Sequence, residues 1–585
     1  MANTYDKASL VLIPSGTKEG VVFSQKPTNG DGDFTFSRST AATRVNADGL
    51  IEKERGNLIL QSNQFDTTWT TLNISVTSGQ SGYDGSSDAW KIEGTGSSVF
   101  SYIIQADATS AVKTKSVYAK AGSVNWVAIW SGASNKAYFD LQNGVVGAIG
   151  GAYVIDSSIT SVGGGWYRCE VAMTQDATSF YIIPANANNS TSLSTGEYVY
   201  IQDAQLEEGL VARDYIETTT SAVYGGITDN VPRLDYTDSS CPSLLLEGQR
   251  TNVVPNSEYA SGYGTNGTGT TTDNANTSPE GLNNAFQLED TSTGDYYRIE
   301  HYHAFSAGDY TFSVFIKKTT GALSHYSGIQ LDVTRKYVIV DTTNGTFTEV
   351  TGTTNDNVTI EDFSEDWWRI SITNNLTAAT HRIAIWPAIS ENGTSINTNA
   401  TGSNLYYGLQ VEEGSYATSY IPTYGTSVTF ASDTAINQAN SNLPTGYPFS
   451  LFAEMDVVDT GSGYAITLLD SSNSVSYYMI EYYSNVWHIT ARPNTAITRI
   501  SSTSAPTLGT HKLLGIYTDS TMKLYLDGAL IASGNNTETW NTNIDDLLLG
   551  QLRTVGDIGT RNPVREALIF NQELTNEEAI ALTTL

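Results

Sequence analysis

Short segments in which apolar and polar residues alternate recur along the chain. In residues 310–316 every second side chain is large and apolar, and Ile370 and Ile372 repeat the pattern. A period of two places alternate side chains on opposite faces of a strand with one buried side. Asn-Gly pairs at 143–144 and 344–345 follow such segments and are typical of tight hairpin turns, because both residues tolerate positive φ. Many short strands separated by turns predict an all-β chain of sandwich or jelly-roll domains.

Two long stretches of the chain repeat each other piece by piece, which is the mark of duplicated domains. The offset between matched pieces grows from 195 residues at Asn57 and Asn252 to 205 residues at Tyr215 and Tyr420. Small loop insertions after a duplication would produce such a drift. We therefore predict two copies of one jelly-roll module, over residues 53–222 and 245–425. The other matched pieces are residues 90–93 with 286–289, 116–120 with 313–317, 143–144 with 344–345, 166–168 with 367–369, and 205–209 with 410–414.

The last part of the chain has a different pattern and predicts a third, unrelated sandwich over residues 446–585. Its expected strands are residues 449–458, 511–517, 522–531 and 565–570, and the third of these turns back at Asp527-Gly528. The tail, residues 575–582, predicts a helix with Thr575 as N-cap and Glu578 as its capping-box partner. The remaining parts are expected to be a strand-rich N-terminal segment (1–52), a lead-in to the second module (223–244) and a polar linker (426–445).

Composition narrows the function classes. Only 16% of the 585 residues are charged, against about 25% in typical soluble domains, and the formal net charge is −31. This acidity argues against a nucleic-acid partner, which needs a basic patch, and against anionic membranes. The cysteines, Cys169 and Cys241, lie at non-equivalent places of the repeats, so we expect neither a disulfide framework nor a cysteine zinc site. No segment reads as a signal peptide or as a membrane span, so no membrane insertion is expected.

The third sandwich resembles concanavalin A-like domains of the laminin-G type. The resemblance rests on His511, Tyr517 and residues 524–528, 567–570 and 574–578. It implies an antiparallel sandwich over residues 446–585. That family contains lectins, adhesins, structural domains and some glycosidases, so the resemblance leaves the activity open.

The two repeats look like the jelly rolls of carbohydrate-binding modules. This resemblance rests on residues 165–168 and on the closing Gln-Leu-Glu-Glu-Gly at 205–209. Many such modules hold a structural Ca²⁺ with an acidic pair beside the closing strand. Of the corresponding stretches, 201–204 keeps one acid, Asp203, and 407–409 keeps none. The resemblance therefore implies Asp203 as a candidate calcium ligand, and no other cofactor is expected.

A set of short sequence segments spread along the chain resembles tailed-phage virion proteins, especially fibre or appendage proteins of marine and gut phages. These segments are residues 9–16, 32–38, 42–46, 48–51, 232–236, 244–252 and 419–423. The resemblance implies a tail or head fibre subunit, commonly a homotrimer, that attaches to other virion proteins through residues 1–52 and binds host cell-surface polysaccharide. Its location would be the virion, released by lysis of the host. Two alternatives stay open, namely a purely structural decoration protein without a ligand and a polysaccharide-degrading enzyme.

Aromatic residues supply the candidate glycan-binding positions. Trp126 and Trp130 share one face of a strand because they are four residues apart, and Tyr138 follows nearby. Exposed, these rings would stack on sugar rings; buried, they would belong to the core, which is the commoner outcome. In the third sandwich, Tyr478 and Tyr483 each belong to a tyrosine pair that alternates faces, so one ring of each pair could be exposed. Trp166, Trp367 and Trp368 recur in the repeats and are expected in the core.

Two motifs offer chemistry that we interpret as structural. Residues 454–459 contain Glu454, Asp456 and Asp459, and they resemble the catalytic strand of laminarinase-type glycosidases, which needs alternating acids on one face. The short Asp459 would widen the gap, and the segment falls on an expected core strand, so we expect no catalytic residue and no enzyme. His301 and His303 share a strand face and could form half of a metal site, with a polar outer face as the alternative.

Overall fold

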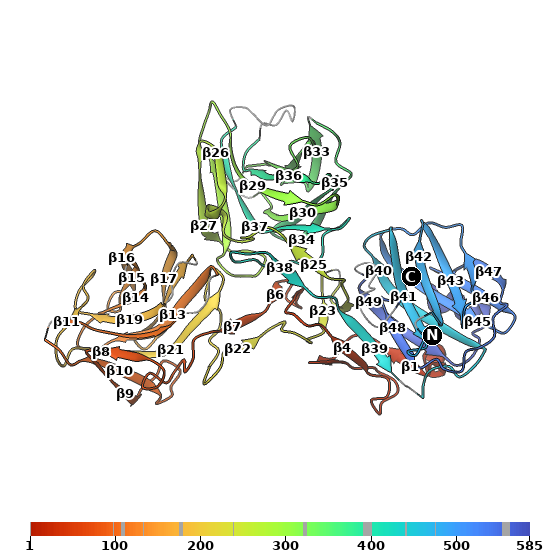
Figure 1. Cartoon of the computed structure of the whole chain (residues 1–585), viewed down its shortest axis with the longest axis horizontal. Coiled ribbons are helices and arrows are strands. Elements are labelled where there is room, and N and C mark those ends of the chain that lie inside the picture. The colour runs from red at the N-terminus through yellow and green to blue at the C-terminus, as the bar shows by residue number, and fades with distance from the viewer. Residues whose placement is uncertain are drawn as a thin grey trace.

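Three β-sandwiches surround a central junction in the computed structural model (Figure 1). The structure describes residues 2–97, 99–106, 111–132, 134–174, 179–237, 239–319, 324–350, 352–389, 400–438, 441–473, 475–552 and 562–585. Within these residues the helical elements are α1 (Ala2–Lys7), η1 (Ala260–Gly262) and α2 (Asn576–Thr583). All other regular elements are strands, so the predicted all-β class is confirmed.

Module 1, the orange and yellow sandwich of Figure 1, consists of two six-stranded sheets over its described residues. In the first sheet the order is β17 (Val154–Gly163), β18 (Trp166–Met173), β13 (Lys113–Ala121), β21 (Tyr198–Glu208), β10 (Ala89–Gly94) and β9 (Ile74–Gln80). In the second the order is β16 (Val145–Gly150), β15 (Asn135–Asp140), β14 (Trp126–Ser131), β19 (Ser179–Ala185), β12 (Tyr102–Ala106) and β8 (Thr70–Leu72). A short pair, β11 (Val99–Phe100) with β20 (Ser192–Leu193), lies beside them.

Module 2, the green sandwich, has the same two strand orders, which confirms the duplication. Its first sheet is β34 (Asn357–Ser364), β35 (Trp367–Leu376), β30 (Gly308–Lys317), β37 (Gly402–Glu413), β28 (Ala285–Asp290) and β27 (Gly269–Asn276). Its second sheet is β33 (Thr346–Val350), β32 (Tyr337–Asp341), β31 (Tyr326–Leu331), β36 (Ala379–Trp386), β29 (Tyr297–Phe305) and β26 (Gly264–Gly267).

The repeated sequence motifs make the same contacts in both modules. The Asn57 amide donates to the carbonyls of Ala204 and Ile216, and that of Asn252 donates to those of Leu409 and Ile421. Trp166 lies opposite Lys120, and Trp367 lies opposite Lys317. Both tryptophans are 2% exposed, as predicted for core residues, whereas Trp368 is half-buried. The Asn-Gly pairs lie in four-residue loops, longer than the tight turns expected, with the carboxylates of Asp140 and Asp341 accepting hydrogen bonds from the loop amides.

The C-terminal sandwich, blue in Figure 1, packs two larger sheets face to face. The first runs β23 (Arg233–Asp235), β24 (Ser243–Leu245), β49 (Val564–Phe570), β40 (Phe449–Val457), β45 (Gly509–Tyr517), β46 (Thr521–Leu526) and β47 (Ala529–Asn535), with β1 (Leu10–Leu12) also paired to β49. The second runs β2 (Thr17–Lys18), β3 (Val21–Val22), β4 (Phe34–Ser37), β39 (Thr434–Gln438), β48 (Asp546–Leu549), β41 (Ser462–Leu469), β42 (Tyr477–Tyr483), β43 (Val486–Arg492) and β44 (Thr498–Ser501).

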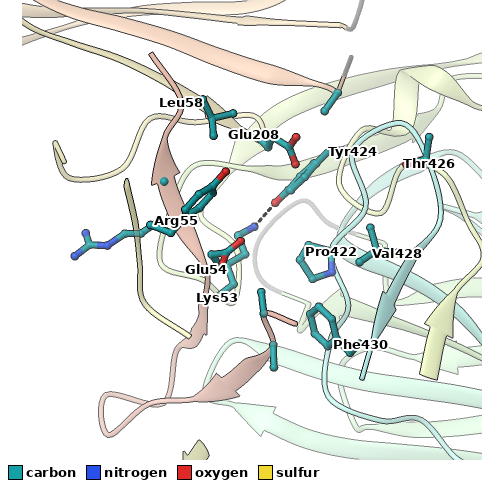
Figure 2. Close-up of a pocket in the computed structure, with 15 residues that line it drawn as sticks. Lys53, Glu54, Arg55, Leu58, Glu208, Pro422, Tyr424, Thr426, Val428 and Phe430 are labelled. Carbon is teal, nitrogen blue, oxygen red and sulfur yellow. Dashed lines mark hydrogen bonds between the residues drawn. The ribbon is translucent and has the colours of Figure 1, made fainter. Parts of the chain in front are cut away.

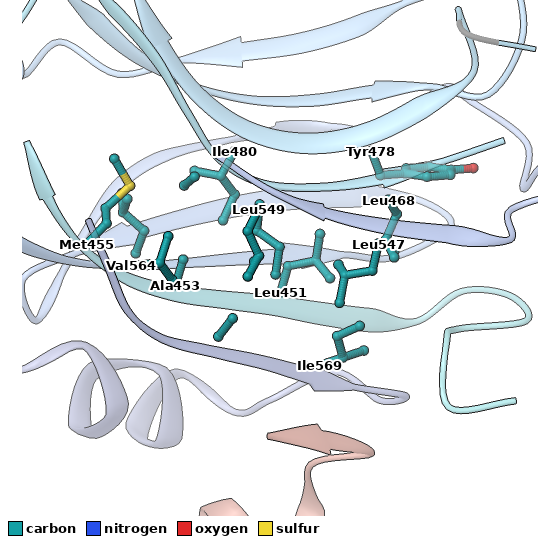
Figure 3. Packing of buried hydrophobic residues seen from close by; sticks show 14 of the residues in the cluster. Leu451, Ala453, Met455, Leu468, Tyr478, Ile480, Leu547, Leu549, Val564 and Ile569 are labelled. Atoms are coloured by element: carbon teal, nitrogen blue, oxygen red, sulfur yellow. The ribbon is translucent and has the colours of Figure 1, made fainter. Parts of the chain in front are cut away.

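The core of this sandwich lies between the two sheets (Figure 3). Leu451, Ala453 and Met455 of β40 face the side chains of Leu547 and Leu549 on β48. The outer face of the first sheet is also covered, because α2 and the N-terminal residues pack on it in a second apolar cluster. The predicted capping box of α2 is present, with Thr575 and Glu578 exchanging hydrogen bonds.

The boundaries of the C-terminal unit differ from those expected from the sequence. Strands β1 to β4 come from the N-terminal segment 1–52, and β39 comes from the expected linker 426–445. Their apolar side chains, such as those of Leu10, Phe34 and Phe36, are buried in the same core as β40. Strand pairing between residues hundreds of positions apart leaves no local pattern. The sequence therefore predicts a strand-rich N-terminal segment without its partners, and it predicts β39 to be linker.

Short ribbons and buried ion pairs hold the sandwiches together at the junction. The ribbons pair β5 (Thr43–Val45) with β6 (Ile51–Lys53), β7 (Arg55–Asn57) with β22 (Val223–Gly225), and β25 (Arg250–Asn252) with β38 (Val428–Phe430). Beside them lies an arginine–carboxylate cluster of Arg38, Arg233, Glu247 and Asp433, whose side chains are at most 6% exposed. The cluster connects segments from both ends of the chain with the lead-in to module 2.

Candidate functional site

Module 1 carries an open group of aromatic rings on the outer face of its second sheet. On β14, Val127 and Ile129 point into the core, so Trp126 and Trp130 point outward and are half-buried. Tyr102 on β12 and Tyr181 on β19 share that face, and Phe100, 39% exposed, lies at its edge. We call these five residues the aromatic face. The sequence placed the two tryptophans on one side of a strand, and the structure shows that this is the outer side.

Four of the five rings of the aromatic face contact one another, namely Phe100, Tyr102, Trp130 and Tyr181. The centroid of Phe100 lies 5.0 Å from that of Tyr102 and 5.8 Å from that of Trp130. Tyr102 meets Tyr181 edge-on at 5.1 Å. Tyr138, the third residue expected here, is fully buried at 0% exposure behind Trp130 and offers no face to a ligand. Burial raises the pKa of the Tyr138 hydroxyl to about 12.

Polar groups border the aromatic face. The Lys136 ammonium lies 4.9 Å from the Trp130 ring centroid and donates to Asn189 Oδ1 at 3.1 Å. Asn188 Oδ1 accepts from the Ala148 amide at 2.8 Å beside Trp126. Apolar ring faces beside a few oriented polar groups are what a sugar ring needs, because it presents apolar C–H faces and hydroxyl edges.

The equivalent face of module 2 carries a different set of rings, with Tyr296, Tyr326 and Tyr337 half-buried on it. The strand registers place Tyr326 and Gln330 at the positions of Trp126 and Trp130. Trp386 is completely buried there, and the Ile389 side chain packs against Gly328, where an added Cβ would lie 2.2 Å from it. Both modules therefore carry aromatic rings on this face, and the two half-buried tryptophans are particular to module 1.

The tyrosines expected to be exposed in the C-terminal sandwich have other contacts. Tyr478 is 0% exposed and stacks on Trp540 with ring centroids 5.0 Å apart, so it belongs to the core. Tyr483 is half-buried; its ring stacks on His488 at 4.3 Å, and its hydroxyl accepts from Arg499 at 2.6 Å. Alternation failed for Tyr478 because its partner, Trp540, comes from a distant loop.

Asp203, the candidate calcium ligand, lies at a bulge of β21 with φ +51°, where Gly408 of module 2 has φ +68°. Its carboxylate accepts a hydrogen bond from the Tyr83 hydroxyl at 3.0 Å. Burial, together with the nearby Asp88 and Asp84 carboxylates, raises the pKa of Asp203 to about 7. Over the part of the chain that the structure describes, no group of three or more His, Cys, Asp or Glu side chains could hold a metal ion. In this structure Asp203 accepts a hydrogen bond from a tyrosine.

Asp203→Asn is expected to stabilise module 1 by up to about 4 kcal/mol above pH 7 and to change little near pH 4. An unfolded aspartate ionises near pH 3.9, whereas native Asp203 keeps its proton to about pH 7. Between these values the native state binds more protons, so stability falls as pH rises, and asparagine removes that loss. Thermal unfolding from pH 4 to 8 measures the difference in stability between the variant and the wild type, with the exposed Asp66→Asn as control. A difference that does not change with pH would contradict the assignment.

The two motifs with candidate chemistry lie at separate places. Glu454 lies on the outer face of the C-terminal sandwich, 3.7 Å from the Lys512 ammonium, and Asp456 accepts hydrogen bonds from Arg565. Asp459 follows the end of β40, outside the strand. His301 and His303 have ring centroids 6.4 Å apart, and burial lowers the pKa of both.

A cavity lies where the N-terminal segment, module 1 and residues 422–430 at the end of module 2 meet (Figure 2). We call it the junction cavity. Its volume is about 350 Å³. Sequence reasoning missed it because its walls come from six separate parts of the chain. The lining residues are Ala41, Ala42, Lys53, Glu54, Arg55, Gly56, Leu58, Ala111, Glu208, Tyr224, Pro422, Tyr424, Thr426, Val428 and Phe430.

The C-terminal sandwich is a concanavalin A-like domain. Residues 424–579 match the concanavalin A-like lectin/glucanases superfamily, in agreement with the resemblance seen over residues 446–585. The match begins before β38 and so includes β39, the strand from the expected linker. No curated protein sequence matches the chain. Within the described residues, no helix is long and apolar enough to cross a membrane.

Parts of the chain are similar to solved structures. The carbohydrate-binding module CBM40 of Ruminococcus gnavus IT-sialidase, bound to α2,3-sialyllactose, is 11% identical with a TM-score of 0.22, over 24% of this chain and 84% of that chain. The receptor-binding domain of botulinum neurotoxin mosaic serotype C/D is 15% identical with a TM-score of 0.22, over 26% of this chain and 39% of that chain. The leech intramolecular trans-sialidase is 13% identical with a TM-score of 0.22, over 24% of each chain. Similarity at this level assigns no ligand to this chain.

Proposed function

We propose that this protein is a bacteriophage appendage subunit, of a tail or head fibre, that binds host surface glycans through the aromatic face of module 1. The observation that carries the proposal is that the outer face of module 1 presents two half-buried tryptophans, which module 2 replaces with Tyr326 and Gln330. A duplicated fold needs no such surface for its own stability, because the core of each module lies between its sheets.

The virion part of the proposal rests on the resemblance of seven sequence segments to phage fibre and appendage proteins. It includes a homotrimeric assembly, contacts with other virion proteins and release by host lysis. The net charge of −31 fits a surface protein that has no nucleic-acid partner. The proposal includes no catalytic activity, because Glu454 and Asp456 face Lys512 and Arg565 as ion-paired scaffold residues.

A glycan array on the purified protein tests the binding role. The wild type is expected to bind a defined set of capsular or surface polysaccharides, and Trp126→Ala combined with Trp130→Ala is expected to weaken that binding about tenfold or more. Stacking contacts of two rings contribute about 0.5–1.5 kcal/mol each, and 1.4 kcal/mol corresponds to tenfold.

The matched control is Tyr326→Ala, at the position of module 2 equivalent to Trp126. It should leave glycan binding unchanged. If the control and the double variant lose binding equally, or if neither loses it, the aromatic face is not the site. Binding to no polysaccharide would favour the purely structural role, and release of reducing sugar would favour an enzyme.

A further inference from the structure

The junction cavity has one acidic wall and one apolar wall. Glu54, from the chain between β6 and β7, and Glu208, at the end of β21, supply the acidic wall. Pro422, Val428 and Phe430 supply the apolar wall (Figure 2), and the rings of Tyr224 and Tyr424 also line the cavity. At about 350 Å³ the cavity falls at the small end of ligand-binding pockets.

The basic residues of the cavity are committed to other partners. The Lys53 ammonium contacts Glu258 at 2.6 Å, Glu280 at 2.9 Å and the Tyr424 hydroxyl at 2.6 Å, which uses all three of its donors. The Arg55 guanidinium points away from Tyr424 and pairs with the exposed Asp214 at 3.0 Å (Figure 2). Neither cation is therefore available to the acidic wall.

The two carboxylates of the acidic wall have no ion-pair or hydrogen-bond partner among the described residues. Burial and the like charges of Asp229 and Glu208 raise the pKa of Glu54 to about 6, and the nearby Arg38 opposes the shift. Burial also raises the pKa of Glu208, opposed by Lys113. Glu54 is half-buried and Glu208 is exposed, and neither forms an ion pair with the nearby Arg38 or Lys113. A bound cation would relieve the repulsion between the two carboxylates.

We propose that the junction cavity binds a primary ammonium group carried on a compact, partly apolar body. The carboxylates of Glu54 and Glu208 would accept its N–H groups, the tyrosine rings would attract its charge, and the apolar wall would cover its carbon skeleton. The chemistry fits an amino sugar or a lysine side chain. The inference is independent of glycan binding at the aromatic face.

Calorimetric titration of the full chain at pH 7.5 tests the inference with four probes. Pentylamine reproduces a lysine side chain and glucosamine is an amino sugar, whereas pentanol and glucose are their neutral counterparts. At least one amine is expected to bind about tenfold or more tightly than its neutral counterpart. Binding of pentylamine alone would indicate a lysine side chain as the natural occupant, and binding of glucosamine alone would indicate an amino sugar.

Variants locate the binding and separate it from folding. Glu54→Gln and Glu208→Gln should each weaken amine binding about tenfold, while Glu365→Gln, an exposed acid of module 2, should have no effect. Within the described residues neither carboxylate has an ion-pair partner, and both have a raised pKa, so both variants should melt at or above the wild-type temperature at pH 7.5. Their glycan-array profile should also stay unchanged, since the aromatic face lies elsewhere on module 1.

Lowering the pH gives an independent readout. Pentylamine, with the amine pKa of lysine near 10.4, stays protonated between pH 8 and 5. Glu54 takes up a proton as the pH falls through about 6, so amine binding should weaken between pH 7.5 and 5. The inference is overturned if neither amine binds, if the neutral compounds bind equally well, or if both glutamine variants bind like the wild type.

Discussion

Replacing Asp433 with alanine is expected to lower the free energy of unfolding by about 3–5 kcal/mol, because it leaves a buried arginine without its counter-charge. Asp433 Oδ1 accepts from Arg38 at 3.0 Å, and both side chains are completely buried. Its other oxygen accepts from Arg233 and from the Glu247 amide. Arg233 keeps Glu247 in the variant, whereas Arg38 keeps only the carbonyl oxygens of Thr40 and Thr228.

The matched control is Asp214→Ala, which breaks a pair whose partners, Arg55 and Asp214, are 38% and 90% exposed. Exposed pairs contribute about 0–1 kcal/mol, so the control should melt close to the wild type. Calorimetry of the full chain measures both variants, and limited proteolysis at the junction shows whether the sandwiches separate. If the Asp433 and Asp214 variants lose the same small amount, the cluster does not hold the junction.

Trp367→Ala is expected to destabilise module 2 by about 3–5 kcal/mol, the usual cost of removing a buried large side chain. The Trp367 indole is 2% exposed and packs in a cluster with Phe315, Tyr407 and Tyr420. The neighbouring Trp368 is half-buried, so Trp368→Ala should cost less and serves as the comparison. An unchanged melting temperature together with lost glycan binding would instead make Trp367 part of a ligand surface.

The duplication could be predicted in detail because its signal is local. Each matched motif makes the same contact in both modules: Arg168 donates to Ser116 and to a backbone carbonyl, and Arg369 does the same with Ser313. Each of these contacts needs a particular residue type at a fixed position in its strand, so the motif can be recognised in both copies. The order of the strands within each sheet could not be predicted in this way and comes from the structure.

The junction, its cavity and its ion pairs could not be predicted, because they depend on contacts between distant residues. Arg38 meets Asp433 across 395 positions, and neither residue has a pattern around it that indicates the other. The same limit applies to Trp126 and Trp130. Their spacing shows that they share a face, but only the packed sandwich shows that Val127 and Ile129 fill the core and the indoles face outward.

The pairing of β1 with β49 has a consequence for the order of events during synthesis. Leu10–Leu12 pair with residues 567–569, and the Tyr5 hydroxyl donates to Glu566 across 561 positions. The six-stranded sheets of each module use a continuous stretch of chain and can form as soon as that stretch leaves the ribosome. The apolar residues of β1 must wait without their partner β49 until residue 569 has been translated. They are therefore the segment that most needs protection by a chaperone while the ribosome is still at work.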